Sequence, residues 1–189
     1  HFSDHADRFK HSAEALDIQL PLSSKKLKAV LEELIAVNKF KETALSMVML
    51  GGPTDDGMHY DRRHTTFFIL ADSFKPLPED VFKKGVAIIT REHLREMPEV
   101  KTLNYLTAVK SHNDPKNKNI LEILYTWQGQ TLECTTSNFF IFKNNTLITQ
   151  NKNILKGVTR SAVLDLARGS FDIEERGLSV QEIFSADEA

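Results

Sequence analysis

Hydrophobic residues recur at helical spacing near the start of the chain and in short, dense runs further along. After Asp4, a candidate N-cap, Phe9, Ala13 and Leu16 predict a helix that ends before Pro21. A second apolar stripe predicts a helix from Ser23 or Ser24 to about residue 37. The segments 45–50, 65–70 and 86–90 are rich in β-branched and aromatic residues, which is typical of strands.

The second half of the chain predicts two hairpins. Segments 120–127 and 130–135 flank Gln128-Gly129, and segments 139–142 and 146–149 flank Lys143-Asn144-Asn145. Helices are predicted over 101–109 and 157–168, and Ser179-Val180-Gln181-Glu182 has the capping-box form that begins a short helix. The pattern indicates an α+β protein with a domain boundary near residues 75–85, where prolines mark a linker.

Composition excludes several classes of protein. The 189 residues carry 24 Lys+Arg and 26 Asp+Glu, a formal charge of −2, which argues against a nucleic-acid binder or a polybasic membrane binder. No apolar run approaches the roughly 20 residues of a membrane span. The single cysteine, Cys134, excludes an internal disulfide and favours a reducing compartment, so we expect a cytoplasmic protein.

Several sequence motifs for metal binding, phosphate binding and hydrolysis are absent. The pairs His1/His5 and His59/His64 lack the glutamate of a zinc hydrolase motif, and Cys134 has no cysteine partner, so we expect no metal site. The chain contains no Gly-x-Gly-x-x-Gly, no Gly-Lys-Ser/Thr phosphate loop and no Gly-x-Ser-x-Gly.

Three separated segments carry a more specific pattern, with a fourth, weaker piece near the start. They are 98–106 around Lys101, Leu132-Glu133-Cys134-Thr135-Thr136-Ser137-Asn138-Phe139, Ile154-Leu155-Lys156-Gly157-Val158-Thr159-Arg160, and His5-Ala6-Asp7-Arg8. In this order, and ending in Ser185-Ala186-Asp187-Glu188, they resemble the class IV, fold-type IV pyridoxal-phosphate enzymes. That family includes branched-chain and D-amino-acid aminotransferases and aminodeoxychorismate lyase.

The resemblance implies a fold and an assembly. We expect a small α/β domain over residues 1–80 and a larger β-rich, cofactor-binding domain over residues 81–189, with pyridoxal 5'-phosphate between them. The family works as homodimers on small-molecule substrates, here an amino acid and a 2-oxo acid.

The resemblance also implies roles for two ionisable residues. Lys101 matches the lysine that forms a Schiff base with the cofactor, and its amine carries a proton once substrate displaces it. Such a lysine must be neutral to attack, which burial or a nearby positive charge favours. Glu133 matches the acid that bonds the pyridine nitrogen and keeps it protonated.

The remaining site residues are assigned by the same resemblance. Gly157, Val158 and Thr159 match a phosphate loop, and they precede a helix whose free N–H groups suit an anion. Leu155 matches the leucine that packs on the cofactor ring, Arg8 a second phosphate ligand, Tyr105 the tyrosine that bonds the phenolic oxygen, and Arg95 an arginine near the substrate. Ser137 and Asn138 are interpreted as residues that shape the loop.

The chain departs from the family pattern in ways that leave the substrate open. The loop 52–60 lacks the Arg-x-His pair of D-amino-acid aminotransferases, although Arg62 or Arg63 can substitute, and Leu103 stands where branched-chain enzymes have glycine. We favour branched-chain-like transamination. The alternatives are an aminodeoxychorismate lyase-like enzyme and a non-catalytic relative, and L or D specificity stays open.

The family pattern also extends beyond this sequence. A strand region normally precedes the His-x-Asp-Arg helix, and a segment after Ala-Asp-Glu supplies further phosphate and substrate contacts. We therefore expect the natural protein to be longer at both ends.

Overall fold

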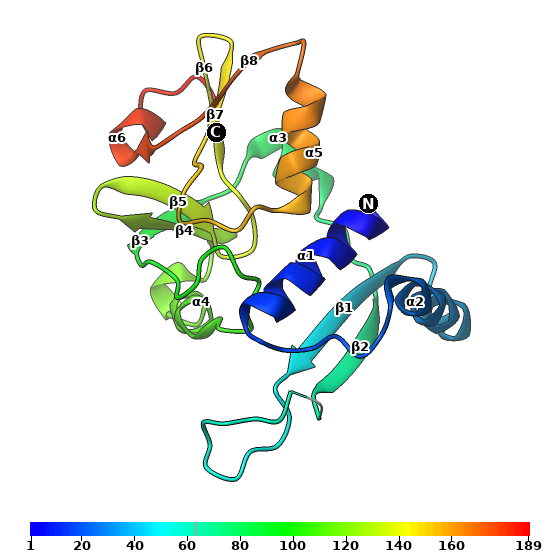
Figure 1. The fold of residues 1–189 in the computed structure, drawn as a ribbon. Helices are drawn as coiled ribbons and strands as arrows, with labels where there is room; N and C mark the ends of the chain where they lie inside the picture. Colours follow the sequence, from blue (N-terminus) through cyan, green and yellow to red (C-terminus); the bar gives the residue numbers. More distant parts are fainter. Residues whose placement is uncertain (63) are drawn as a thin grey trace. The chain divides into compact units, whose positions relative to one another are not determined.

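The structure is a computed structural model that describes residues 1–62 and 64–189. Contacts divide the chain into two compact units, His1–Pro78 and Glu79–Ala189, and each is described by itself. Figure 1 shows the course of the chain through both.

The first unit places two helices against a β-hairpin. It contains helices α1 (Phe2–Ala15) and α2 (Ser24–Asn38) and the antiparallel strands β1 (Thr43–Leu50) and β2 (Thr66–Ser73). The prediction of Asp4 as N-cap is wrong, because α1 begins at Phe2 and His1 is its cap; Asp4 lies in the first turn, where a carboxylate suits the helix dipole. Ser23 caps α2, accepting a hydrogen bond from the Lys26 N–H at 3.4 Å.

Alternation along the hairpin explains how this unit packs. Leu45 and Met47 of β1 and Phe67 and Ile69 of β2 lie on one face of the hairpin, as a strand period of two requires. They pack with residues that the helices bury at helical spacing: Ala6, Leu27 and Leu31. The helices therefore cover one face of the two-stranded sheet.

The second unit contains two small sheets and four α-helices among the described residues. The helices are α3 (Glu79–Lys84), α4 (Leu106–His112), α5 (Val158–Ala167) and α6 (Val180–Ile183), with a 3₁₀ turn at Pro115–Asn117. The strands are β3 (Ile88–Glu92), β4 (Glu122–Trp127), β5 (Gln130–Cys134), β6 (Phe140–Lys143), β7 (Thr146–Thr149), β8 (Asp172–Glu175) and β9 (Leu178–Ser179). One sheet has the order β3-β4-β5-β9 and the other β6-β7-β8.

Both predicted hairpins are present. Strands β4 and β5 turn at Gln128-Gly129, and β6 and β7 turn at Asn144-Asn145. All four turn residues have positive φ, which glycine and asparagine adopt most readily. Strand β3 joins β4 in parallel, and β8 joins β7 in parallel.

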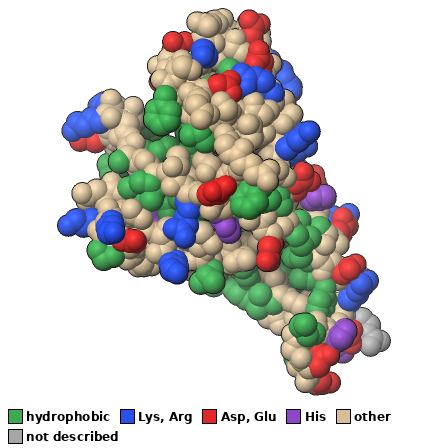
Figure 2. All heavy atoms as spheres, turned by 90° about the vertical axis from the view of Figure 1, so that its left-hand side faces the viewer, with side chains coloured by type: hydrophobic (Ala, Val, Ile, Leu, Met, Phe, Trp, Pro, Cys, Tyr) green, Lys and Arg blue, Asp and Glu red, His purple; other side chains and the backbone are tan. Residues whose placement is uncertain are grey.

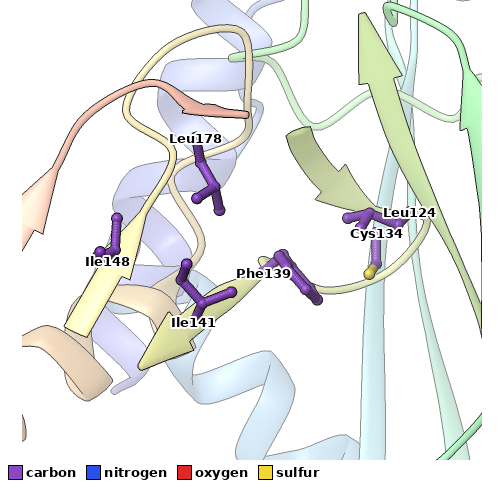
Figure 3. Packing of buried hydrophobic residues seen from close by; sticks show 6 residues of the cluster. All are labelled: Leu124, Cys134, Phe139, Ile141, Ile148 and Leu178. Carbon is purple, nitrogen blue, oxygen red and sulfur yellow. The ribbon is translucent and has the colours of Figure 1, made fainter. Parts of the chain in front are cut away.

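The two sheets share a buried apolar cluster. Leu124 and Cys134 come from the first sheet, Ile141 and Ile148 from the second, and Phe139 and Leu178 complete the cluster. Figure 3 shows these side chains, which come from strands of both sheets and from Phe139 just before β6. The cluster fixes β5 against β6, and the residues that connect these strands belong to the candidate site.

The structure corrects two further expectations and adds two strands. The helix predicted over 101–109 is α4, which begins only at Leu106, because residues 100–105 form tight turns with the Thr102 N–H bonded to the Val100 carbonyl. The linker prediction extends too far, since α3 already begins at Glu79. Strands β8 and β9 were not predicted, because Asp172–Glu175 is mostly charged and β9 has two residues. In the described part of the chain, no helix is both long and apolar enough to cross a membrane.

Candidate active site

Glu133 is the centre of a buried polar cluster in the second unit. It lies near the end of β5, and its side chain is 8% exposed. Its Oε1 accepts hydrogen bonds from Arg95 Nε at 3.0 Å and Arg95 Nη2 at 2.6 Å. Its Oε2 accepts from the Leu155 backbone N–H at 3.0 Å and from Asn138 Nδ2 at 3.2 Å. A buried carboxylate needs such donors, and this one has four.

Opposing influences act on the protonation of Glu133. Burial raises the pKa of the Glu133 carboxyl, while Arg95, the Leu155 N–H and the charge of Lys101 act to lower it. Arg95 is itself 17% exposed and also donates to the carbonyls of Pro98 and Val100. The guanidinium that was predicted to lie near the substrate is therefore bonded to Glu133 and to the turn that precedes Lys101.

Lys101 lies on the exposed side of this cluster. Its Nζ donates to the Tyr105 hydroxyl at 2.8 Å and lies 5.6 Å from the centre of the Tyr105 ring. Tyr105 is the residue before the first turn of α4, so the rigid helix start fixes its position. Arg95, which is bonded to Glu133, also donates to the carbonyl of Val100, so the turn that carries Lys101 is tied to the Glu133 cluster.

Asn138 joins Glu133 to the segment that was predicted to bind phosphate. Its Nδ2 donates to the Leu155 carbonyl at 2.8 Å as well as to Glu133. A Cβ atom added at Gly157 would lie 2.3 Å from Asn138 Oδ1, a distance that no side chain can occupy. A side chain at this position would therefore displace the Asn138 amide, which approaches the backbone directly.

Gly157 is the N-cap of α5, and no side chain caps this helix start. Val158 is buried at the first helical position, whereas Thr159 is exposed at the second. A helix N-terminus presents N–H donors and the positive end of the helix dipole, which together favour an anion. Asn138 therefore links the two features: it donates to Glu133, and its side chain lies against Gly157 at the uncapped start of α5.

A second carboxylate, which the sequence analysis did not single out, holds the loop between β5 and β6. Glu122 of β4 accepts from the Thr136 N–H at 3.2 Å, from Ser137 Oγ at 3.4 Å, and from the hydroxyls of Thr135 and Thr136. The loop leads directly to Asn138, so the interpretation of this segment as loop-shaping agrees with its contacts. Three successive hydroxyl residues after Glu133 were the available signal, because such residues commonly bond a nearby acceptor.

The remaining predicted residues lie in the first unit. Arg8 is on α1, with Nη2 3.5 Å from His5 Nδ1. Arg62 forms an ion pair with Asp17 at 3.1 Å, and Arg63 lies outside the described residues. The loop between β1 and β2 carries acidic and histidine side chains, and Figure 2 shows side chains of these two kinds close together on part of the surface. Among the residues that the structure describes, no group of three or more His, Cys, Asp or Glu is arranged to hold a metal.

The fold is one that amino-group-transferring enzymes adopt. The crystal structure of an aminotransferase from Brucella abortus bound to the co-factor PLP matches it with a TM-score of 0.83, 22% identity, and coverage of 98% of this chain and 69% of that chain.

Sequence comparison identifies the family. The pattern described as amino-transferase class IV matches residues 1–189, so the chain belongs to that family, as the resemblance predicted. The chain is 28% identical to a D-alanine aminotransferase of Listeria monocytogenes over 99% of its length and 67% of the relative. It is 30% identical to a proposed branched-chain-amino-acid aminotransferase of Methanocaldococcus jannaschii over 98% of its length and 67% of that relative. The matched region is about two thirds of each relative.

Proposed function

We propose that the second unit binds pyridoxal 5'-phosphate and that the protein transfers an amino group between an amino acid and a 2-oxo acid. The buried Glu133 carboxylate carries this proposal. Burying a charge is costly, and four donors from three separate segments converge to compensate it. A buried carboxylate with this many donors is unusual unless it has a function, and the family pattern marks a lysine, Lys101, for the same site.

The residues present fit the cofactor chemically. The neighbourhood offers an amine at Lys101, a hydroxyl at Tyr105, a buried acid at Glu133 and an uncapped helix start at Gly157. The two Glu133 oxygens already receive four donors, which is about the capacity of a carboxylate. A ring N–H must therefore share or replace one of them, and Asn138, at 3.2 Å the longest of the four, is the donor that we expect to yield.

The roles of the side chains follow from their surroundings. When bound, pyridoxal phosphate supplies an aldehyde for the amino group and a ring that withdraws electrons from the substrate. Glu133 holds a proton at the ring nitrogen, and Arg95 favours the anionic form of Glu133 against burial, which raises the pKa of its carboxyl. Lys101 provides the amine that attaches the cofactor and moves a proton at the substrate Cα. Tyr105 orients Lys101 through the 2.8 Å hydrogen bond.

The proposal extends to the phosphate and ring contacts. The N–H groups at the start of α5 and the Thr159 hydroxyl bind phosphate, with Arg8 as a further ligand, and Leu155 packs on the ring. By the same resemblance the protein works as a homodimer.

We favour transamination of branched-chain amino acids over the other reactions of the family. A D-specific enzyme needs an arginine for the substrate carboxylate in the loop after β1. Arg62, the described arginine in that loop, is instead 3.1 Å from Asp17. A panel of branched-chain L-amino acids, D-alanine and aminodeoxychorismate, each assayed for amino transfer or pyruvate release, separates the three activities.

The lysine assignment has a direct chemical test. Borohydride reduction of the protein with bound cofactor, followed by peptide mapping, is expected to find the cofactor on Lys101. Lys110 of α4 is an exposed lysine of the same unit and serves as the matched control. Lys101→Ala should lose the covalent label and Lys110→Ala should keep it. A label on another lysine in the unaltered protein contradicts the assignment.

A further inference from the structure

The connection from β7 to α5 carries Leu155 and Gly157 of the proposed cofactor site, and its outer part lines a cavity. Residues Gln150–Asn153 line an open, polar cavity of about 360 Å³. The other lining residues are Trp127, Gln128, Gln130, Leu132, Arg176 and Gly177. Contacts other than close packing must therefore fix where this segment runs.

Two buried polar side chains supply those contacts. Gln150 is 4% exposed; its Nε2 donates to the Thr131 carbonyl at 2.8 Å, and its Oε1 accepts from the N–H groups of Asn151 at 2.9 Å and Lys152 at 3.2 Å. Arg160 of α5 is also 4% exposed, and its Nη2 donates to the Gln150 carbonyl at 3.0 Å and to Glu175 Oε2 at 2.9 Å. Together they connect β5, the start of the segment, α5 and β8.

The position of Arg160 makes the arrangement unusual. It is the third residue of α5, where a positive charge opposes the helix dipole, and its Nε has no hydrogen-bond partner in the described structure. The helix dipole therefore does not favour an arginine here, and the bonds to Gln150 and Glu175 hold it in place. Thr131, which receives the Gln150 amide, lies two residues before Glu133, so the same contacts tie the helix start to the strand that carries the buried acid.

We infer that Arg160 and Gln150 form a brace that positions the start of α5 for the phosphate of the cofactor, relative to Glu133. The inference rests on the proposed function, because it assigns positioning residues to that same site. The inner end of the segment is held by Glu133 and Asn138, and the brace holds its outer end. Neither brace residue needs to touch the cofactor.

The test compares two ligands that differ only in the phosphate. Apoprotein is titrated with pyridoxal phosphate and with pyridoxal, and binding is followed by absorbance. The unaltered protein should bind the phosphorylated ligand much more tightly. In Arg160→Met and Arg160→Lys, that preference should fall by about tenfold or more, as expected when a charge-assisted contact is lost, while pyridoxal affinity stays nearly constant.

Two further variants distinguish a positioning role of Arg160 from a general effect of positive charge. Arg168→Met removes an exposed arginine at the end of α5, paired with Asp165 at 2.7 Å, and should leave the preference unchanged. Glu175→Gln removes a negative charge but keeps Arg160. If Arg160 acted only through its long-range charge, this variant would bind phosphate more tightly; if Arg160 is a positioning residue, the variant binds it equally or more weakly.

The possible results distinguish a failure of the brace from a failure of the proposed phosphate site. A preference for the phosphate retained in both Arg160 variants overturns the brace and leaves the proposed function intact. Equal losses for both ligands, with a matching fall in melting temperature, show a merely structural arginine and also overturn it. An unaltered protein that does not prefer the phosphorylated ligand overturns the proposed phosphate site and the brace with it.

Discussion

Two regions of the molecule contain many ionisable side chains and use them in opposite ways. In the loop 54–64, Asp56 contacts His59 and Asp61 contacts His64, each pair three residues apart in the sequence. In the Glu133 cluster, the partners Arg95 and Leu155 lie 38 and 22 residues away. The loop pairs are exposed, whereas the Arg95–Glu133 pair is 17% and 8% exposed.

Burial and the sequence separation of the partners distinguish a charged side chain with a function from an ordinary surface charge. Local, exposed pairs are screened by water and contribute little, and they form wherever a short turn brings the side chains together. A buried carboxylate with partners from distant segments forms only when the fold brings those segments together. The loop has more titratable groups, but the cluster is the better candidate for chemistry.

The largest expected effect is at Glu133. Replacement Glu133→Gln keeps the size of the side chain but no longer favours a proton at the cofactor's ring nitrogen. We expect turnover to fall by about 10²-fold or more, the usual scale for removing one preorganised electrostatic contact. Single-turnover kinetics of the loaded protein measures the effect. Unchanged turnover would show that Glu133 is not the pyridine partner.

Gly157 tests how tightly the cluster meets the helix start. In Gly157→Ala the new methyl group would overlap Asn138 Oδ1, so the Asn138 side chain, its loop or the helix must shift. We expect a loss of roughly 1–3 kcal/mol in stability, as for overpacked sites, and weaker cofactor binding. Thermal unfolding measures the first and absorbance titration the second.

Gly177→Ala is the matched control for this substitution. Its Cβ would meet the end of the flexible Gln130 side chain at 3.0 Å, which can move away. Equal losses in the two variants would mean that the Asn138 contact has no special role.

Glu182 lies between the two extremes, because it is partly exposed but well partnered. Arg176 and the Ser179 N–H lower the pKa of the Glu182 carboxyl from 4.5 to about 2. A lowered native pKa stabilises the folded form above pH 4.5, and that stabilisation is lost as the pH falls from about 4.5 to 2. In Glu182→Gln the melting temperature should depend less on pH across this range. An unchanged pH profile would contradict the assignment.

The smallest effect is expected in the exposed loop. Backbone N–H groups of His59 and Met58 and the His59 side chain hold the pKa of Asp56 well below its usual range, but the group faces water. Asp56→Asn should leave the melting temperature and amino transfer at neutral pH unchanged within error. A marked loss of activity would show that the loop takes part in the reaction, and the comparison between the regions would fail.

The sequence predicts contacts that lie within one element better than contacts between elements. The hairpins, the Ser23 cap and the capping box at Ser179 follow from local turn and capping chemistry. The start of α4 does not, because the predicted helix 101–109 begins with residues that instead form turns, which Arg95 and neighbouring backbone groups hold. Periodicity cannot report such distant partners.

The same limit applies to the site. Motif spacing pointed to Lys101, Glu133 and Gly157, and the contacts between Glu133, Leu155 and Asn138 are consistent with these assignments. It did not reveal that Arg95, which follows β3, binds Glu133 or that Glu122 of β4 holds the loop after β5, because both contacts arise from the order β3-β4-β5 in one sheet.

The burial of Cys134 has a practical consequence for spectroscopy. It is the single cysteine of the sequence, and burial raises the pKa of its thiol to about 12, so little thiolate forms at neutral pH. A cysteine introduced at an exposed position, such as Asp56 of the loop or Asp165 of α5, would then be the site that thiol-specific dyes modify. Pairs of such labels would report the distance between the two units in solution without removing the native cysteine.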